Sequence, residues 1–157
     1  MAGDLARDAN LRFMGKAYTE IFLCDTAAAH TIFIGTPMVI NQGTDTTHVE
    51  PYLDALETKP EDVCVGIAAE RVVVALGDPE TKEISCYTWP TIIGFENATS
   101  ALTNEDLGKK CYFSGSGLLS GNQTATDNCE VGTLYRVEDN YAFVRLSTPT
   151  VQASAGA

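Results

Sequence analysis

Gly132-Thr-Leu-Tyr-Arg-Val-Glu-Asp-Asn-Tyr-Ala-Phe-Val-Arg-Leu146 is the stretch that decides the fold of this chain. Val131–Val137 is rich in β-branched and aromatic residues, and Glu138-Asp139-Asn140 is a turn signal. From Tyr141 to Leu146 every second side chain then falls on the same face, and this period of two is typical of a strand. The pattern predicts a β-hairpin that closes a small β-barrel or sandwich.

Short strand-like segments with turn signals between them continue through the chain, spaced by about 8–12 residues. Val63–Leu76 is the most apolar part, and Gly66 within it indicates a bulge or a close backbone approach. Thr103–Gly108 has the residues of a single helical turn, capped by Thr103 and closed by glycine. Further strands are expected at Glu20–Asp25, Glu83–Trp89 and Thr91–Phe95, and Thr31–Ile40 has the pattern of a strand, a Gly-Pro turn and a second strand. The predicted fold class is all-β, a small barrel or sandwich.

The two ends differ in composition from this β-rich part. We divide the chain into an N-terminal arm (residues 1–20), a β-rich domain (residues 21–146) and a C-terminal tail (residues 147–157). The arm shows neither a helical nor a strand period, so it either orders against another chain or is a frayed terminus. Its apolar side chains are the expected partner contacts: Leu5, Leu11, Phe13, Met14 and Tyr18. We expect both ends to contact neighbouring chains rather than their own β core.

The net charge is −11, from 21 acidic and 10 basic residues. No basic footprint for DNA or RNA is present, so nucleic-acid binding is not expected. The acidity favours solubility and would suit docking on a basic surface. No apolar run is long enough to cross a bilayer, and the N-terminus lacks an apolar signal core. We therefore expect no membrane association and no Sec export.

Cysteine and histidine are scattered. The chain has five cysteines: Cys24, Cys64, Cys86, Cys111 and Cys129. An odd count without short spacings predicts buried thiols in a reducing cytoplasm, with no disulfide. His30 and His48 are the only histidines and form no HxH or HExxH motif, so no metal site is expected. Asp45 lies near His48, but no nucleophile context accompanies them.

The remaining candidates have simpler explanations. The paired carboxylates lie at predicted turns, which accounts for their composition: Glu61-Asp62, Glu105-Asp106 and Glu138-Asp139. We therefore expect no catalytic residue and no cofactor. Tyr87 and Trp89 either pack in the core or form an exposed aromatic patch at an edge strand, where they would contact a partner.

Three segments together resemble one protein family. Val63-Cys-Val-Gly-Ile-Ala-Ala-Glu70, Leu102-Thr-Asn-Glu-Asp-Leu-Gly-Lys-Lys-Cys-Tyr-Phe113 and the closing hairpin Gly132–Leu146 resemble, in order and spacing, segments of the head decoration proteins of tailed bacteriophages, also called capsid cement proteins. The resemblance covers most of residues 31–146.

The resemblance implies a non-enzymatic virion protein with a β-tulip-like fold. Such a protein is made in the host bacterial cytoplasm, often forms a homotrimer, and binds the outer surface of the head. It clamps neighbouring major capsid protein subunits after expansion, with avidity from many weak contacts. The alternatives are another phage morphogenesis component, such as a tail-tube or head-completion protein, or a generic β-barrel binding module; a small hydrolase is a third class.

Overall fold

The computed structural model describes residues 5, 7–41, 45–52, 62–97, 102–114, 118–121 and 129–149. They form thirteen strands and one short 3₁₀ helix. In chain order the elements are β1 (Arg12–Met14), β2 (Thr19–Cys24), β3 (His30–Ile32), β4 (Pro37–Asn41), β5 (Asp45–Pro51), β6 (Asp62–Ala68), β7 (Val72–Val74), β8 (Glu83–Tyr87), β9 (Ile92–Glu96), η1 (Asn104–Asp106), β10 (Lys110–Ser114), β11 (Leu118–Ser120), β12 (Cys129–Glu138) and β13 (Tyr141–Leu146). The predicted all-β fold class is confirmed.

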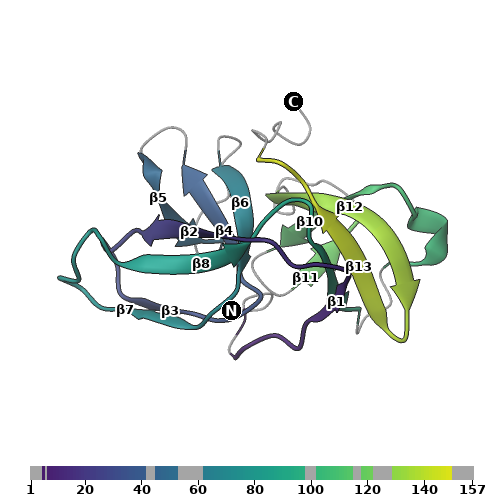
Figure 1. Ribbon diagram of the computed structural model, residues 1–157, viewed down its shortest axis with the longest axis horizontal. Coiled ribbons are helices and arrows are strands. Elements are labelled where there is room, and N and C mark those ends of the chain that lie inside the picture. The colour runs from purple at the N-terminus through teal and green to yellow at the C-terminus, as the bar shows by residue number, and fades with distance from the viewer. Residues whose placement is uncertain are drawn as a thin grey trace.

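The strands form three sheets (Figure 1). One is a closed five-stranded barrel in the order β2-β5-β4-β6-β8. The second is a six-stranded sheet in the order β1-β9-β13-β12-β10-β11, and the third is the pair β3-β7. Apart from the parallel pair β2-β5, all strand pairs among the described residues are antiparallel. Closure of the barrel leaves its strands without a free edge.

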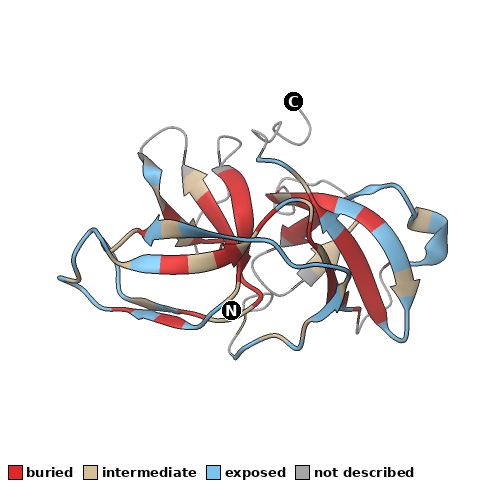
Figure 2. Cartoon of the chain, viewed as in Figure 1, coloured by how far each residue is buried: buried red, intermediate tan, exposed pale blue. Residues whose placement is uncertain are grey.

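Two apolar cores hold the sheets together. The barrel core contains, among others, Met38, Val65 and Ile84, together with Val72 and Val74 from β7. The second core joins outward-facing barrel residues such as Val39 and Ile67 to side chains of the six-stranded sheet. Strands β4 and β6 therefore contribute to both cores, and Figure 2 shows β6 buried along its length. Burial on two faces explains why Val63–Ala68 reads as one apolar run.

Gly66 confirms the expected irregularity in β6. The register between β4 and β6 shifts between Met38, which lies opposite Gly66, and Val39, which lies opposite Cys64. A Cβ atom added at Gly66 would lie 2.6 Å from the carbonyl oxygen of Tyr87 on β8. The glycine thus allows both a bulge and a close backbone approach.

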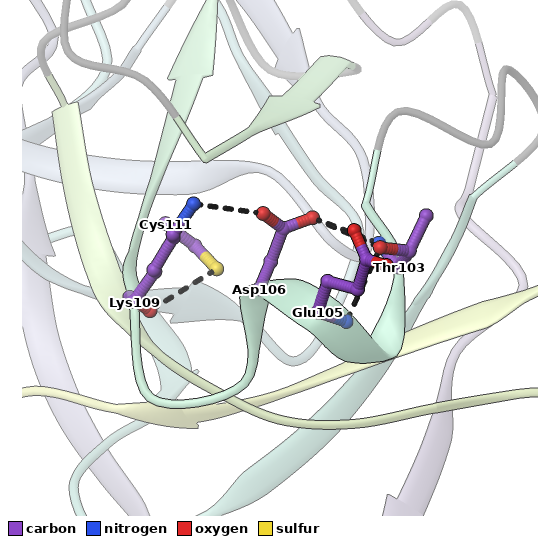
Figure 3. A network of polar contacts seen from close by, with 5 residues as sticks. All are labelled: Thr103, Glu105, Asp106, Lys109 and Cys111. Atoms are coloured by element: carbon purple, nitrogen blue, oxygen red, sulfur yellow. Dashed lines mark hydrogen bonds and ion pairs between the residues drawn. The ribbon is translucent and has the colours of Figure 1, made fainter.

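The β12–β13 hairpin and the helical turn also form as predicted, but the prediction that the hairpin closes the barrel is wrong. The barrel closes by pairing of β2 with β8, whereas β12 and β13 lie in the middle of the six-stranded sheet. Strands β12 and β13 pair up to Glu138 and Tyr141, and the turn residues Asp139 and Asn140 both have positive φ. Two successive positive φ angles are the geometry of a type I′ turn. The Thr103 side chain accepts a hydrogen bond from the Glu105 N–H, and Asp106 accepts one from the Thr103 N–H (Figure 3). This reciprocal capping box stabilises η1.

The N-terminal segment packs on the chain's own sheets, so the prediction that the arm avoids its own β core is wrong for residues 7–20. Strand β1 pairs with β9, and the Ala9 N–H donates to the carbonyl of Ile34. Strand β2, which belongs to the barrel, already begins at Thr19. The physical reason is that β9 would otherwise present an unpaired strand edge, and pairing with β1 satisfies its backbone groups. The arm also covers Tyr141, whose hydroxyl accepts from Asn10 Nδ2 at 2.9 Å.

The described start of the C-terminal tail also contacts its own core. The Ser147 N–H donates to the carbonyl of Val131, and the Ser147 hydroxyl donates to Glu130. The prediction that the tail avoids its own β core is therefore wrong for residues 147–149. Residues 150–157, to which that prediction also applied, lie outside the described residues.

All five cysteines are buried and carry free thiols, as their positions in apolar strands predicted. Burial raises the pKa of the Cys24 thiol to about 11, although Lys82 partly opposes the shift. Burial likewise raises the pKa of the Cys111 thiol to about 12 and strongly raises that of Cys86. Since the thiolate is the nucleophile, the raised pKa values and the burial both lower the reactivity expected of these groups in the folded state.

Thiol titration should separate the folded and unfolded protein. We expect the native protein at pH ~8 to react only slowly with a disulfide reagent, because little thiolate is present and access is closed. The same protein unfolded in urea without reductant should release all five thiols. Recovery of three or fewer from the unfolded protein would contradict the absence of a disulfide.

Candidate functional site

Trp89 lies at the surface, with 55% of the residue exposed, so core packing is the wrong interpretation for this side chain. It follows β8 and precedes Pro90 through a cis peptide bond. Tyr18, with 41% exposed, precedes β2, the strand that pairs with β8. We call Tyr18 and Trp89 the aromatic surface.

Thr91 holds the two segments of the aromatic surface together. Its hydroxyl oxygen accepts from the Tyr18 N–H at 2.8 Å and its O–H donates to the Tyr18 carbonyl at 3.2 Å. The Thr88 N–H also donates to the Tyr18 carbonyl at 2.9 Å. Thr91 is itself buried, so these bonds are shielded from water. The backbone segments that carry the two rings are therefore held in a fixed relative position.

Two shallow grooves flank the aromatic surface. The first, of about 390 Å³, is lined by Met14, Lys16, Tyr18, Trp89, Ile92 and Arg145, together with Gly15 and Pro90. The second, of about 380 Å³, is lined by Tyr18, Glu20, Phe22, Val65, Trp89 and Pro149, among others. The first groove carries two cations, and none of its described lining residues is acidic. We call it the cationic groove.

The structure divides the candidate contact residues into three groups. Met14, Tyr18 and Trp89 lie together at the cationic groove. Leu11 and Tyr87, by contrast, are partly buried against the core between barrel and sheet. Two further candidates take intermediate positions: Phe13 is 40% exposed and packs at a tilt against Tyr87 with ring centroids 4.9 Å apart, and Leu5 is half-buried.

Lys16, Ile92 and Arg145 belong to the cationic groove but were missed by sequence reasoning. Arg145 lies directly opposite Ile92 on β9, and Ile92 lies directly opposite Met14 on β1. Alternation along β13 places Arg145 outside the core, but no local pattern shows which strands lie beside it. Only the sheet order brings these three segments together.

The cations of the groove differ from most of the other lysines and arginines among the described residues. Five described cations form ion pairs with nearby carboxylates: Arg71, Lys82, Lys109, Lys110 and Arg136. The Lys16 ammonium instead lies 5.1 Å from the Tyr18 ring centroid, and the Arg145 guanidinium lies 5.3 Å from that of Tyr135. Such cation–π contacts leave the charge available to a further anion.

No cluster of three or more metal-ligating side chains occurs among the described residues. The two histidines lie on different sheets. His48 on β5 contacts the Thr47 hydroxyl through Nδ1 and the Glu80 carbonyl through Nε2. The side chain of Asp45, its neighbour in sequence, lies outside the described part. In that same part, no helix has the length and apolarity to span a bilayer.

His30 on β3 should make folding stability sensitive to acid. Its Nε2 is buried without a hydrogen-bond partner in the described structure, and burial lowers its pKa despite the opposing charge of Asp25. Because the unfolded chain binds this proton more tightly, the contribution is complete above pH ~6.5 and is lost as pH falls towards the folded pKa. Urea unfolding across this range should show the loss in wild type and less of it in His30→Gln. An identical pH profile in the two proteins would contradict the assignment.

Comparisons of this chain with protein-family models, with curated proteins and with solved structures found no match.

Proposed function

We propose that this chain is a head decoration protein of a tailed bacteriophage, which binds the outer capsid surface and joins neighbouring major capsid protein subunits. The three segments that resemble this family correspond to β6, to η1 with β10, and to the hairpin β12–β13. All three contribute to the core between barrel and sheet or border it. The resemblance therefore concerns mainly the body of the fold, while Tyr18 and Trp89 of the aromatic surface lie outside these three segments.

The observation that carries this proposal is the exposed aromatic surface. Trp89 and Tyr18 are large amphipathic rings on a firmly bonded backbone, beside two grooves. Tryptophan and tyrosine are enriched among residues that dominate protein–protein binding, and a rigid platform loses little entropy on docking. Such a surface supports a structural, non-enzymatic role, because a protein of this kind acts by binding its partner.

Co-sedimentation with expanded phage heads that lack this chain tests the proposal. Wild-type protein should pellet with the heads, and Trp89→Ala should weaken binding by about tenfold or more. Val73→Ala is the matched control, because Val73 is 59% exposed but lies on β7, outside the aromatic surface. Failure of wild-type protein to bind heads at all would remove the proposal.

Deletion of residues 1–16 would be a poorer test, because β1 and Ala9 are hydrogen-bonded to the rest of the fold and their loss could unfold the chain. A point substitution at an exposed ring avoids that difficulty. The proposal includes a homotrimer, which light scattering of the purified protein measures directly. It also places the protein on the virion exterior, where labelling of intact particles should detect it.

A further inference from the structure

The charge of the cationic groove is opposite to that of the whole chain. The net charge is −11, yet Lys16 and Arg145 line one groove whose described lining contains no carboxylate. Neither cation forms an ion pair with another described residue; each contacts an aromatic ring instead. The net charge of the whole chain favours a basic partner, whereas the local charge of the cationic groove favours an acidic one.

The geometry of the groove suits an extended segment. Arg145, Ile92 and Met14 occupy directly opposed positions on β13, β9 and β1, so they form one row across three strands. Adjacent strands lie about 4.8 Å apart, so the row spans about 10 Å. Lys16 follows Met14 after Gly15, which has a positive φ of 74° and turns the chain. Apolar contacts therefore lie between the two cations.

We infer that the cationic groove binds an acidic, extended segment of a partner protein that also carries an apolar side chain. The apolar side chain packs on Trp89 and Ile92, and carboxylates pair with Lys16 and Arg145. A guanidinium offers a bidentate fork to a carboxylate, which fixes orientation as well as charge. This inference rests on the proposed function, under which the partner is the major capsid protein.

Charge disfavours two other occupants. A nucleic acid would bring a continuous row of phosphates towards a protein of net charge −11. A second copy of this chain in the groove would bring another −11 with it, so it is a less favourable occupant than a partner of lower charge, and the proposed homotrimer would form through other surfaces. A short acidic segment on a partner of lower overall charge avoids most of that repulsion, and the two cations then select it.

Trp89 is the only tryptophan in the chain, so its fluorescence reports directly on the groove. We would titrate the full chain with a short peptide of glutamate, aspartate, leucine and phenylalanine, and with a counterpart in which lysine replaces the acids. The acidic peptide should shift Trp89 emission saturably, and added salt should weaken it. Equal binding of both peptides, or no saturation by about 1 mM acidic peptide, overturns the inference.

Charge reversal tests the two cations. Lys16→Glu/Arg145→Glu should weaken acidic-peptide binding by about tenfold or more, and Lys16→Gln/Arg145→Gln by less. Lys109→Glu is the control for reversal of a charge outside the groove, because the Lys109 side chain is 60% exposed and pairs with Asp106 of η1. Unchanged affinity in the charge-reversed variant, with an unchanged circular-dichroism spectrum, overturns the inference. Tighter binding of an oligothymidylate than of the peptide, or Trp89 emission that shifts with self-association, also overturns it.

Co-sedimentation with expanded heads distinguishes a failure of this inference from a failure of the proposed function. If wild-type protein and the charge-reversed variant pellet equally with expanded heads, the groove assignment fails and the decoration function stands. If wild-type protein does not pellet, the decoration function fails, and the peptide titration alone decides whether the groove binds acidic segments. Loss of head binding in the charge-reversed variant but not in Lys109→Glu supports both.

Discussion

Gly132→Ala should destabilise the protein by about 3 kcal/mol or more, at or above the upper end of the usual cost of overpacking. Gly132 lies in β12, where it pairs with both Cys111 and Leu146. An added Cβ would overlap the carbonyl oxygen of Arg145 and would lie 2.8 Å from Cγ1 of Val144. The first of these atoms is backbone in a paired strand, so it cannot move aside without breaking the β12–β13 pairing in the middle of the six-stranded sheet.

Urea unfolding of Gly132→Ala measures this cost, and Gly77→Ala provides the comparison. Gly77 has a φ of 88° with no heavy atom within 4 Å of an added Cβ. Alanine there meets only the strain of a left-handed conformation, about 1 kcal/mol. We expect the Gly132 variant to lose several times more stability than the Gly77 variant. Equal losses would show that the close approach in the hairpin relaxes easily.

Ile84→Ala should cost about 2–5 kcal/mol, the range for large-to-small changes in a packed core. Ile84 is fully buried inside the barrel, where residues from β3 and β7 also pack. Truncation removes apolar contacts and leaves a cavity that the closed barrel cannot collapse, because each strand is held by two neighbours.

Ile21→Ala is the matched control for the barrel. Ile21 lies on β2, the strand hydrogen-bonded to β8, but it points outwards and is 65% exposed. The same chemical change there should alter stability by no more than about 0.5 kcal/mol. A large loss at Ile21 would instead indicate that a further interface covers the outer face of β2. Thermal and urea unfolding of both variants separate these outcomes.

The aromatic surface could be predicted only in part. Trp89, beside a proline at the end of an alternating strand, already indicated either a core position or an exposed patch. Deciding between the two positions requires knowing which strands lie beside Trp89, because the exposure of a side chain depends on what covers it. The Tyr18 backbone is bonded to Thr91, 73 residues later. Contacts of that separation leave no local periodicity, so Lys16 and Arg145 could not be assigned to one groove.

The sequence by itself determined the local elements: the β12–β13 hairpin and its positive-φ turn, the capped turn at Thr103, and the irregularity at Gly66. These follow from backbone preferences and hydrogen bonds within a few residues. Only the tertiary structure decided that the N-terminal segment covers Tyr141 and pairs with β9. That choice depends on which sheet edge and face would otherwise be exposed to water, and burial of this kind is a property of the assembled sheets.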